Sequence, residues 1–124
     1  LYLRGYVDAL SGPLYAAADL FLMPSSFEPC GISQMLAMRV GQPCVVHAVG
    51  GLKDTVEHGV TGFVFAGETP ADQAENFVSC VHEALAVKQN KPARWKKICA
   101  TAALRRFSWE VAALNYQQKL YQHE

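Results

Sequence analysis

The stretch CVVHAVGGLKDTVEHGVTGFVFA, residues 44–66, determines the fold class that this sequence predicts. Its two apolar runs, CVVHAV and GFVFA, have the length and the β-branched or aromatic content of buried strands. Between them, Gly50 and Gly51 predict a turn, and LKDTVEHG predicts one or two turns of helix. Strand, helix and strand in this order predict two parallel neighbours, because parallel strands need a crossover connection.

The segments before residue 44 show the same alternation. LYLRGYV at residues 1–7 and LFLMP at residues 20–24 predict two further strands, with a helix between them. A short helix is predicted over residues 32–39 and ends before a Gly-Gln-Pro turn. Four apolar strands that alternate with helices predict an α/β fold, a Rossmann-like parallel sheet with flanking helices.

Three amphipathic helices are predicted over about residues 70–122. Thr69 and Pro70 supply an N-cap and a first-turn proline to the first of them, whose apolar residues recur at spacings of three and four. The second follows Pro92, and Ser108 is predicted to cap the third. We expect these helices to be structural.

The length and charge of the chain restrict the number of domains and the kinds of partner that we expect. A chain of 124 residues predicts a single domain over residues 1–124. Eleven basic residues balance eleven acidic ones, so no overall field favours nucleic acid or an anionic membrane. Without a long apolar run or a signal-peptide pattern, the sequence predicts a soluble cytoplasmic protein. Because the chain starts inside an apparent strand at Leu1, we expect it to be a piece of a longer protein.

The cysteine and histidine pattern predicts neither a metal nor a cofactor. The four cysteines, Cys30, Cys44, Cys80 and Cys99, form no CxxC pair and no Cys/His spacing of a zinc site. We therefore expect reduced thiols. His47, at the end of CVVHAV, is a candidate proton carrier, but a strand-end histidine bonded to backbone is the preferred interpretation.

The stretch FEPCGISQ, residues 27–34, carries the candidate site. Pro29 disfavours helical geometry at Glu28, which places this carboxylate in an extended residue just after a strand. Ligands of open α/β sheets bind at such strand ends. Gly31 permits close backbone approach, and the amides of Ile32, Ser33 and Gln34 would form the positive end of the next helix. A carboxylate beside such amides suits a sugar phosphate or sugar nucleotide, although the same residues also make a plain turn.

Three segments resemble the C-terminal half of bacterial glycogen synthases and plant starch synthases. They are LYAAADLFLMPSSFEPCGISQMLAM, GGLKDTVEHGVTGFVF and RFSWEVAALNY, which together span nearly the whole chain. The pair FEPCGxxQ and GGLxDTV is specific. The resemblance implies a GT-B glycosyltransferase, in which two Rossmann-like domains face each other and the C-terminal one holds most of an ADP-glucose or UDP-glucose donor. It also allows a plastid location if the source is a plant.

The resemblance implies a role for each matching residue. Glu28 matches a glutamate beside the donor glucose and is the catalytic candidate. Residues 30–34 match the turn that meets the donor sugar and phosphate: Cys30, Gly31 and Ile32 line the sugar, Ser33 meets the diphosphate, and Gln34 follows them. Tyr6 matches an aromatic that stacks on the nucleotide base, with an interfacial core tyrosine as the alternative. Gly50 and Gly51 are implied as pocket-lining backbone.

The implied reaction retains configuration at the anomeric carbon and adds α-1,4-linked glucose to a glucan acceptor. The leaving diphosphate helps to deprotonate the acceptor hydroxyl, so the family needs no dedicated basic side chain, no metal and no cofactor. Two positions depart from related enzymes. Leu36 stands where other retaining transferases have a second glutamate, which many glycogen synthases also lack. Val49 stands where many family members have threonine. No second carboxylate suits the pattern of glycoside hydrolysis.

Two hypotheses remain open from the sequence. The first is the donor-binding lobe of a glucan synthase, which needs the missing N-terminal domain of the same polypeptide and is inactive alone. The second is a stand-alone module that binds sugar nucleotide or a protein partner without catalysis. Neither involves nucleic acid or a membrane.

Overall fold

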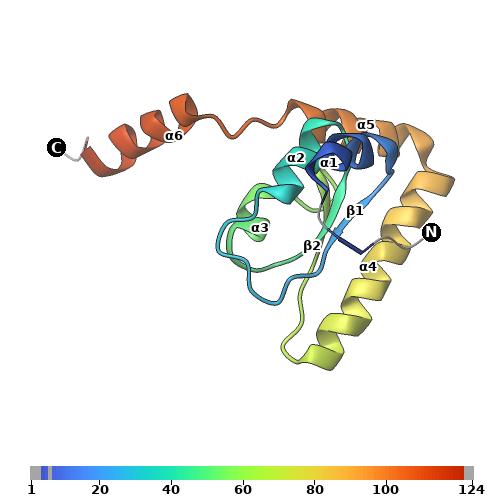
Figure 1. Ribbon diagram of the computed structural model, residues 1–124. Coiled ribbons are helices and arrows are strands. Elements are labelled where there is room, and N and C mark those ends of the chain that lie inside the picture. The colour runs from blue at the N-terminus through green and yellow to red at the C-terminus, as the bar shows by residue number, and fades with distance from the viewer. Residues whose placement is uncertain (1–3, 6, 122–124) are drawn as a thin grey trace.

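A three-stranded parallel sheet forms the centre of the molecule (Figure 1). The computed structural model describes residues 4–5 and 7–121. Strands β1 (Phe21–Met23), β2 (Cys44–His47) and β3 (Gly62–Phe65) pair in the order β1-β2-β3. Both pairs are parallel, with Val45 opposite Leu22 on one side and opposite Phe63 on the other. The predicted α/β fold with a parallel sheet is confirmed.

Helices account for most of the remaining chain. They are α1 (Asp8–Ala17), α2 (Ser33–Arg39), α3 (Gly50–Thr55), α4 (Pro70–Asn90), α5 (Pro92–Leu104) and α6 (Trp109–Tyr116), followed by the π-helix η1 (Gln117–Tyr121). In the part of the chain that the structure describes, no helix combines the length and the hydropathy that a membrane crossing requires. Helix α3 begins at Gly50, two residues earlier than predicted, because the Gly-Gly pair is part of its first turn.

The strand predicted over residues 1–7 is not observed where it can be checked. Residues 1–3 and 6 lie outside the described residues, and Arg4, Gly5 and Val7 are not in a strand. The extended backbone of Val7 instead forms the N-cap of α1, with Asp8 in the first turn. The described sheet therefore has three strands rather than the four that the sequence predicts.

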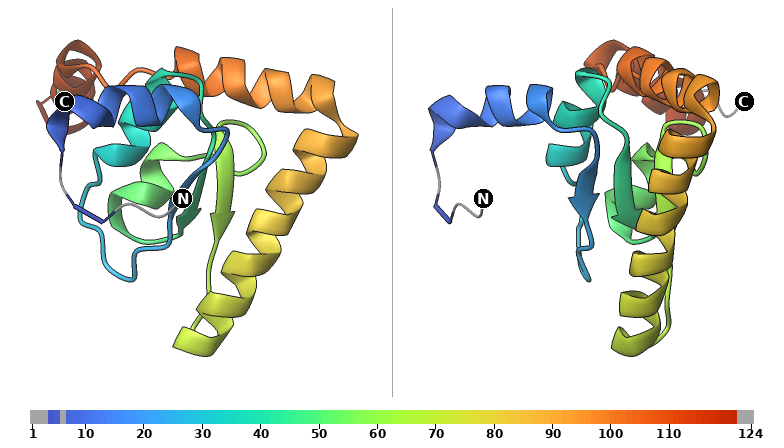
Figure 2. Two further views of the ribbon diagram at one scale, coloured as in Figure 1. Left: turned by 45° about the vertical axis from the view of Figure 1, so that its right-hand side comes forward. Right: turned by 90° about the vertical axis from the view of Figure 1, so that its right-hand side faces the viewer.

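Both faces of the sheet are buried, as a parallel sheet with helical crossovers requires. Along β2, Cys44 and Val46 face a core cluster built with α2 and α3, whereas Val45 faces a second cluster built with α4 and α5. Figure 2 shows α1 and α2 on one side of the sheet and α4 on the other. Full burial of one Val or Phe side chain contributes about 1.5–3 kcal/mol, so the two clusters hold the layers together.

Local sequence signals explain the start of α4. The Thr69 hydroxyl accepts a hydrogen bond from the Asp72 N–H, and the Thr69 N–H donates to the Asp72 carboxylate. This reciprocal pair is a capping box, and Pro70 occupies the first turn. The predicted helix start is confirmed.

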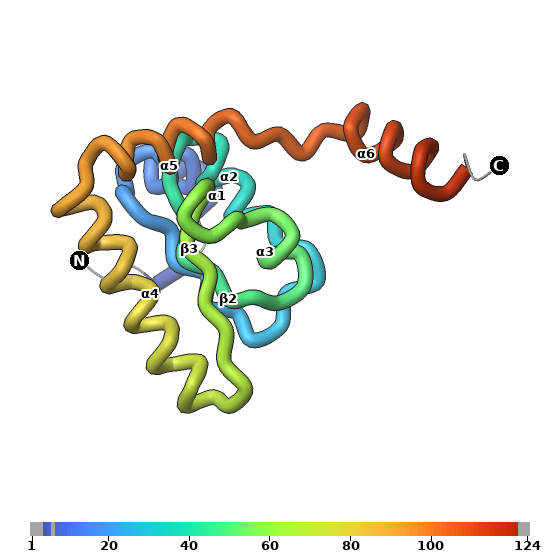
Figure 3. Tube along the Cα trace, turned by 180° about the vertical axis from the view of Figure 1, so that it is seen from behind, coloured from blue at the N-terminus to red at the C-terminus, as the bar shows by residue number. Residues whose placement is uncertain are grey.

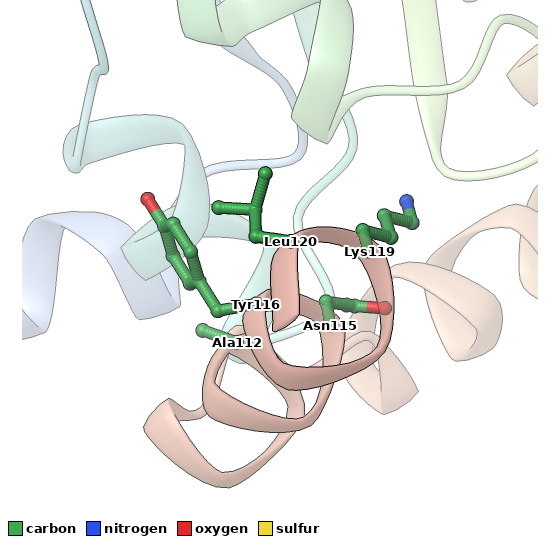
Figure 4. Close-up of a pocket in the computed structure, with 5 residues that line it drawn as sticks. All are labelled: Ala112, Asn115, Tyr116, Lys119 and Leu120. Carbon is green, nitrogen blue, oxygen red and sulfur yellow. The ribbon is translucent and has the colours of Figure 1, made fainter. Parts of the chain in front are cut away.

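Helix α6 and η1 extend away from the sheet (Figures 1 and 3). No residue of either segment is buried, and Trp109 is 86% exposed. Ser108 occupies the N-cap position, but its side chain makes no capping hydrogen bond, unlike the prediction. Figure 4 shows a hollow beside this segment, which among the described residues is lined by members of α6 and η1: Ala112, Asn115, Tyr116, Lys119 and Leu120. The hollow is therefore an open face of one helical segment rather than an enclosed pocket.

Candidate functional site

The candidate site lies at the carboxyl edge of the sheet. The loop of residues 24–32 follows β1, and Gly50 and Gly51 come shortly after the end of β2. Because β1 and β2 are parallel, both segments leave the same edge. Open α/β sheets bind their ligands at this edge, so the structure brings the two sequence motifs to the edge where a ligand is expected.

The two motifs are in direct backbone contact. The Gly51 N–H lies 3.3 Å from the Glu28 carbonyl oxygen and 3.2 Å from that of Pro29, and donates to both. A Cβ on Gly51 would stand 2.1 Å from the Cys30 carbonyl oxygen, closer than any side chain tolerates. Only glycine fits here, and its N–H sets the path of the loop that carries Glu28.

Gln34 links the same two motifs through its side chain. Its Nε2 donates to the Gly31 carbonyl oxygen at 2.9 Å and to the Thr55 hydroxyl at 3.1 Å. The Thr55 hydroxyl in turn donates to the Gly51 carbonyl oxygen at 2.7 Å. Gln34 is completely buried, so its side chain positions the loop, and only its backbone N–H remains a candidate ligand contact.

His47 holds the first part of the loop. Its Nδ1 lies 3.0 Å from the Ser25 carbonyl oxygen, and because a carbonyl only accepts, Nδ1 carries the proton in this contact. The imidazole is buried and stacks on Phe65, with ring centroids 4.9 Å apart. The preferred interpretation of His47 as a backbone-bonded strand-end histidine is confirmed.

The remaining candidate residues differ in exposure. Glu28 and Ser33 are half-buried, Cys30 is exposed, and Ile32 is 66% exposed. Ile32 is the N-cap of α2 and Ser33 its first residue, so the helix starts one residue later than predicted, without a side-chain cap bond. Tyr6 lies outside the described residues, so its place relative to Glu28 stays a prediction.

The cysteines differ sharply in their surroundings, although all four are free thiols. Burial raises the pKa of the Cys44 thiol to about 12. Burial and then the charge of Glu83 raise the pKa of the Cys80 thiol to about 11. Of the four, only Cys30 is exposed, and it lies in the candidate site.

The sequence reasoning missed the positioning residues of this site. It assigned Gln34 to ligand contact and gave Thr55 no role at the site, whereas together they connect the loop to the Gly-Gly turn. The only available signal was the occurrence of both residues in the two motifs of the resemblance, FEPCGxxQ and GGLxDTV.

Comparisons with known proteins identify relatives of this chain. The family model described as "Glycosyl transferases group 1" matches residues 1–83. The glycogen synthase of Streptococcus agalactiae is 44% identical over 118 residues, which cover 91% of this chain and 24% of that protein. The chain thus spans about a quarter of the length of this relative.

Solved structures of glycosyltransferases also resemble the chain. The catalytic domain of starch synthase IV from Arabidopsis thaliana, bound to ADP and acarbose, has a TM-score of 0.79 at 31% identity, covering 94% of this chain and 24% of its own. Anabaena HepE in complex with UDP-glucose has a TM-score of 0.57 at 27% identity, covering 89% of this chain and 29% of its own.

Proposed function

The chain belongs to the glycosyl transferases group 1 family, and we propose that it is the donor-binding part of a retaining glucosyltransferase of the glycogen or starch synthase type. The identity to glycogen synthases over 91% of the chain supports this proposal. The observation that carries it is the contact between the Glu28 loop and the Gly50–Gly51 turn, which holds the family's candidate glutamate at the ligand edge of the sheet.

The proposed donor is ADP-glucose or UDP-glucose. The neighbour bound to ADP has a TM-score of 0.79, and the neighbour bound to UDP-glucose has one of 0.57, so similarity favours the adenine nucleotide. The proposed acceptor is the non-reducing end of an α-1,4-glucan. No cofactor or metal takes part in the proposed reaction.

Glu28 is the proposed catalytic residue. In the reaction, the bond between the anomeric carbon and the diphosphate oxygen breaks, and a bond to the acceptor hydroxyl oxygen forms on the same face of the sugar. The acceptor proton passes to the leaving diphosphate. The Glu28 carboxylate accepts hydrogen bonds from glucose hydroxyls and stabilises positive charge at the anomeric carbon, which is largest in the transition state.

The turn around Gly31 supplies the remaining proposed contacts. Cys30, Gly31 and Ile32 line the sugar, and the Ser33 hydroxyl with the first amides of α2 meets the diphosphate. A helix N-terminus contributes at most ~2 kcal/mol to an anion, so the amides of α2 need further cationic groups to hold a diphosphate. We assign these groups to the rest of the polypeptide, since the chain covers only 24% of the length of the Streptococcus agalactiae glycogen synthase.

The isolated chain is proposed to bind its donor weakly and to have no turnover. A helix N-terminus contributes at most ~2 kcal/mol to an anion and base stacking by Tyr6 ~1–3 kcal/mol, whereas micromolar affinity needs about 8 kcal/mol. An amide NMR titration of the chain with ADP-glucose, UDP-glucose and inorganic phosphate tests this. Saturable shifts at millimolar ligand, confined to Tyr6 and residues 30–34, are expected.

A substitution in the complete polypeptide tests the role of Glu28. Glu28→Ala should lower kcat by roughly 10²–10³-fold and change the nucleotide Kd by less than about threefold, because the carboxylate acts mainly in the transition state. Glu75→Ala on the exposed face of α4 is the matched control and should leave both constants unchanged. Unchanged turnover in Glu28→Ala would remove Glu28 from the mechanism.

A further inference from the structure

Three potential metal ligands converge outside the candidate site. His58 lies in the segment between α3 and β3, and Cys80 and Glu83 lie on α4. One ligand atom from each residue lies within 4.8 Å of the other two. These segments are far apart in the sequence, so the three residues form no short Cys/His motif. For this reason the sequence predicted no metal.

The cluster rests on two packed elements. Cys80 and Glu83 are three residues apart on α4 and therefore share one helical face. Cys80 is buried in the core cluster that α4 forms with β3, which restricts the position of its sulfur. Glu83 is exposed at the same face, so the cluster has a buried thiol at its base and a carboxylate at its rim.

The backbone of Val64 holds the His58 imidazole along β3. Its N–H lies 3.1 Å from His58 Nδ1, and its carbonyl oxygen lies 3.2 Å from the same nitrogen. Val64 can therefore serve Nδ1 either as an acceptor or as a donor. When Nδ1 donates to the carbonyl oxygen, Nε2 has a free lone pair, which is the tautomer that a metal requires.

We propose that His58 Nε2, Cys80 Sγ and a Glu83 carboxylate oxygen bind one Zn²⁺ ion, with water as the fourth ligand. Zinc bond lengths of about 2.0–2.3 Å at tetrahedral angles place neighbouring ligand atoms roughly 3.3–3.6 Å apart. His58 Nε2 and Glu83 Oε1 are already 3.4 Å apart. The other pairs lie within 4.8 Å, so they need to close by at most on the order of 1 Å, which small shifts of the half-exposed His58 and Glu83 side chains supply.

The donor set favours zinc over magnesium or calcium. Thiolate and imidazole suit zinc, whereas the hard cations prefer oxygen ligands only. On binding, the Cys80 thiol releases its proton to solvent and the thiolate sulfur bonds to the metal. The side chains of His58 and Glu83 are 47% and 43% exposed, which leaves room for the water ligand. The bound ion would tie the segment before β3 to α4 and so stabilise this edge of the sheet.

Cobalt spectroscopy on the unmodified 124-residue chain tests the sulfur ligand. After chelation and dialysis, Co²⁺ is added as a probe, and a thiolate-to-cobalt charge-transfer band in the near ultraviolet is expected at one ion per chain. Cys80→Ser should abolish the band. Cys99→Ser, at a half-buried cysteine on α5, is the matched control and should retain it. A band of equal intensity in Cys80→Ser would overturn the proposal, as would its absence from the unmodified chain.

Zinc-dependent stability tests the carboxylate without disturbing the core. Zinc at about 100 times its Kd should raise the Tm by roughly 5–10 °C. Glu83→Gln should weaken zinc binding at least about tenfold, whereas Glu75→Gln on the same helix should bind as the unmodified chain does. Equal zinc affinity in both variants would show adventitious binding to surface histidines and would overturn the proposed site.

Discussion

Gly50 faces the backbone of Glu28 so closely that a Cβ on Gly50 would stand 1.8 Å from the Glu28 carbonyl oxygen. Gly50 also has a φ of +44°, a conformation that residues with a side chain rarely adopt. The position of the candidate catalytic glutamate therefore depends on the absence of a side chain on the neighbouring β2–α3 turn.

Replacing Gly50 tests this relationship. Gly50→Ala should destabilise the chain by about 1–3 kcal/mol, because the new Cβ is strained and collides with backbone that cannot move independently. Gly12→Ala is the matched control: Gly12 lies in α1 with no atom within 4 Å of an added Cβ, and alanine favours a helix. Urea unfolding measures both effects, and equal stability of the two variants would contradict the tight contact.

The Gln34–Thr55 link predicts energetic coupling. Gln34→Ala should lower the free energy of unfolding by about 2–4 kcal/mol, because it leaves the carbonyl groups of Gly31 and Cys30 without the buried amide that donates to them. In a double-mutant cycle with Thr55→Val, the loss of unfolding free energy in the double variant should differ from the sum of the two single losses by about 0.5–3 kcal/mol. Gln89→Ala on the exposed side of α4 should have no measurable effect. Additive losses would show that the hydrogen bond between the two side chains contributes nothing.

Thiol alkylation should distinguish the cysteines. The thiolate is the reactive form, so iodoacetamide at pH 8 should modify the exposed Cys30 first. Cys44 and Cys80 should stay unmodified in the folded chain, because burial raises their pKa values to about 12 and 11. Peptide mapping by mass spectrometry after timed quenching measures the order. Early modification of Cys44 without unfolding would contradict its buried position.

Cys44 should also make the chain less stable at alkaline pH. Its folded-state pKa, about 12, lies above the ordinary value of 9.0, so its contribution is complete below pH 9 and declines as pH rises towards 12. Between pH 8 and pH 10 the stability advantage over Cys44→Ala should shrink by about 1.4 kcal/mol. Val45→Ala, a truncation of the neighbouring core residue, is the control. It keeps Cys44, so the difference in unfolding free energy between the unmodified chain and Val45→Ala should not change with pH. Urea unfolding at each pH measures these differences.

Local sequence patterns were sufficient for most elements of the fold. The apolar runs at residues 20–24, 44–49 and 62–66 contain the three strands, and the capping residues before Pro70 mark the start of α4. These signals depend on interactions within a few residues, or on burial of both sheet faces, and both are visible in one sequence. The strand predicted over residues 1–7 lacks such support at its described positions, because extended backbone at Val7 caps a helix equally well.

The sequence by itself determined the α/β class, the family resemblance and the loop that carries Glu28. Only the tertiary structure showed that Gly50 and Gly51 contact the backbone of this loop, and that a hydrogen bond between Gln34 and Thr55 connects the two motifs. It also showed the cluster of possible metal ligands around Cys80. The physical reason is that these contacts join segments far apart in the chain. Their geometry is set by strand register and helix packing, and local sequence patterns do not predict either of these.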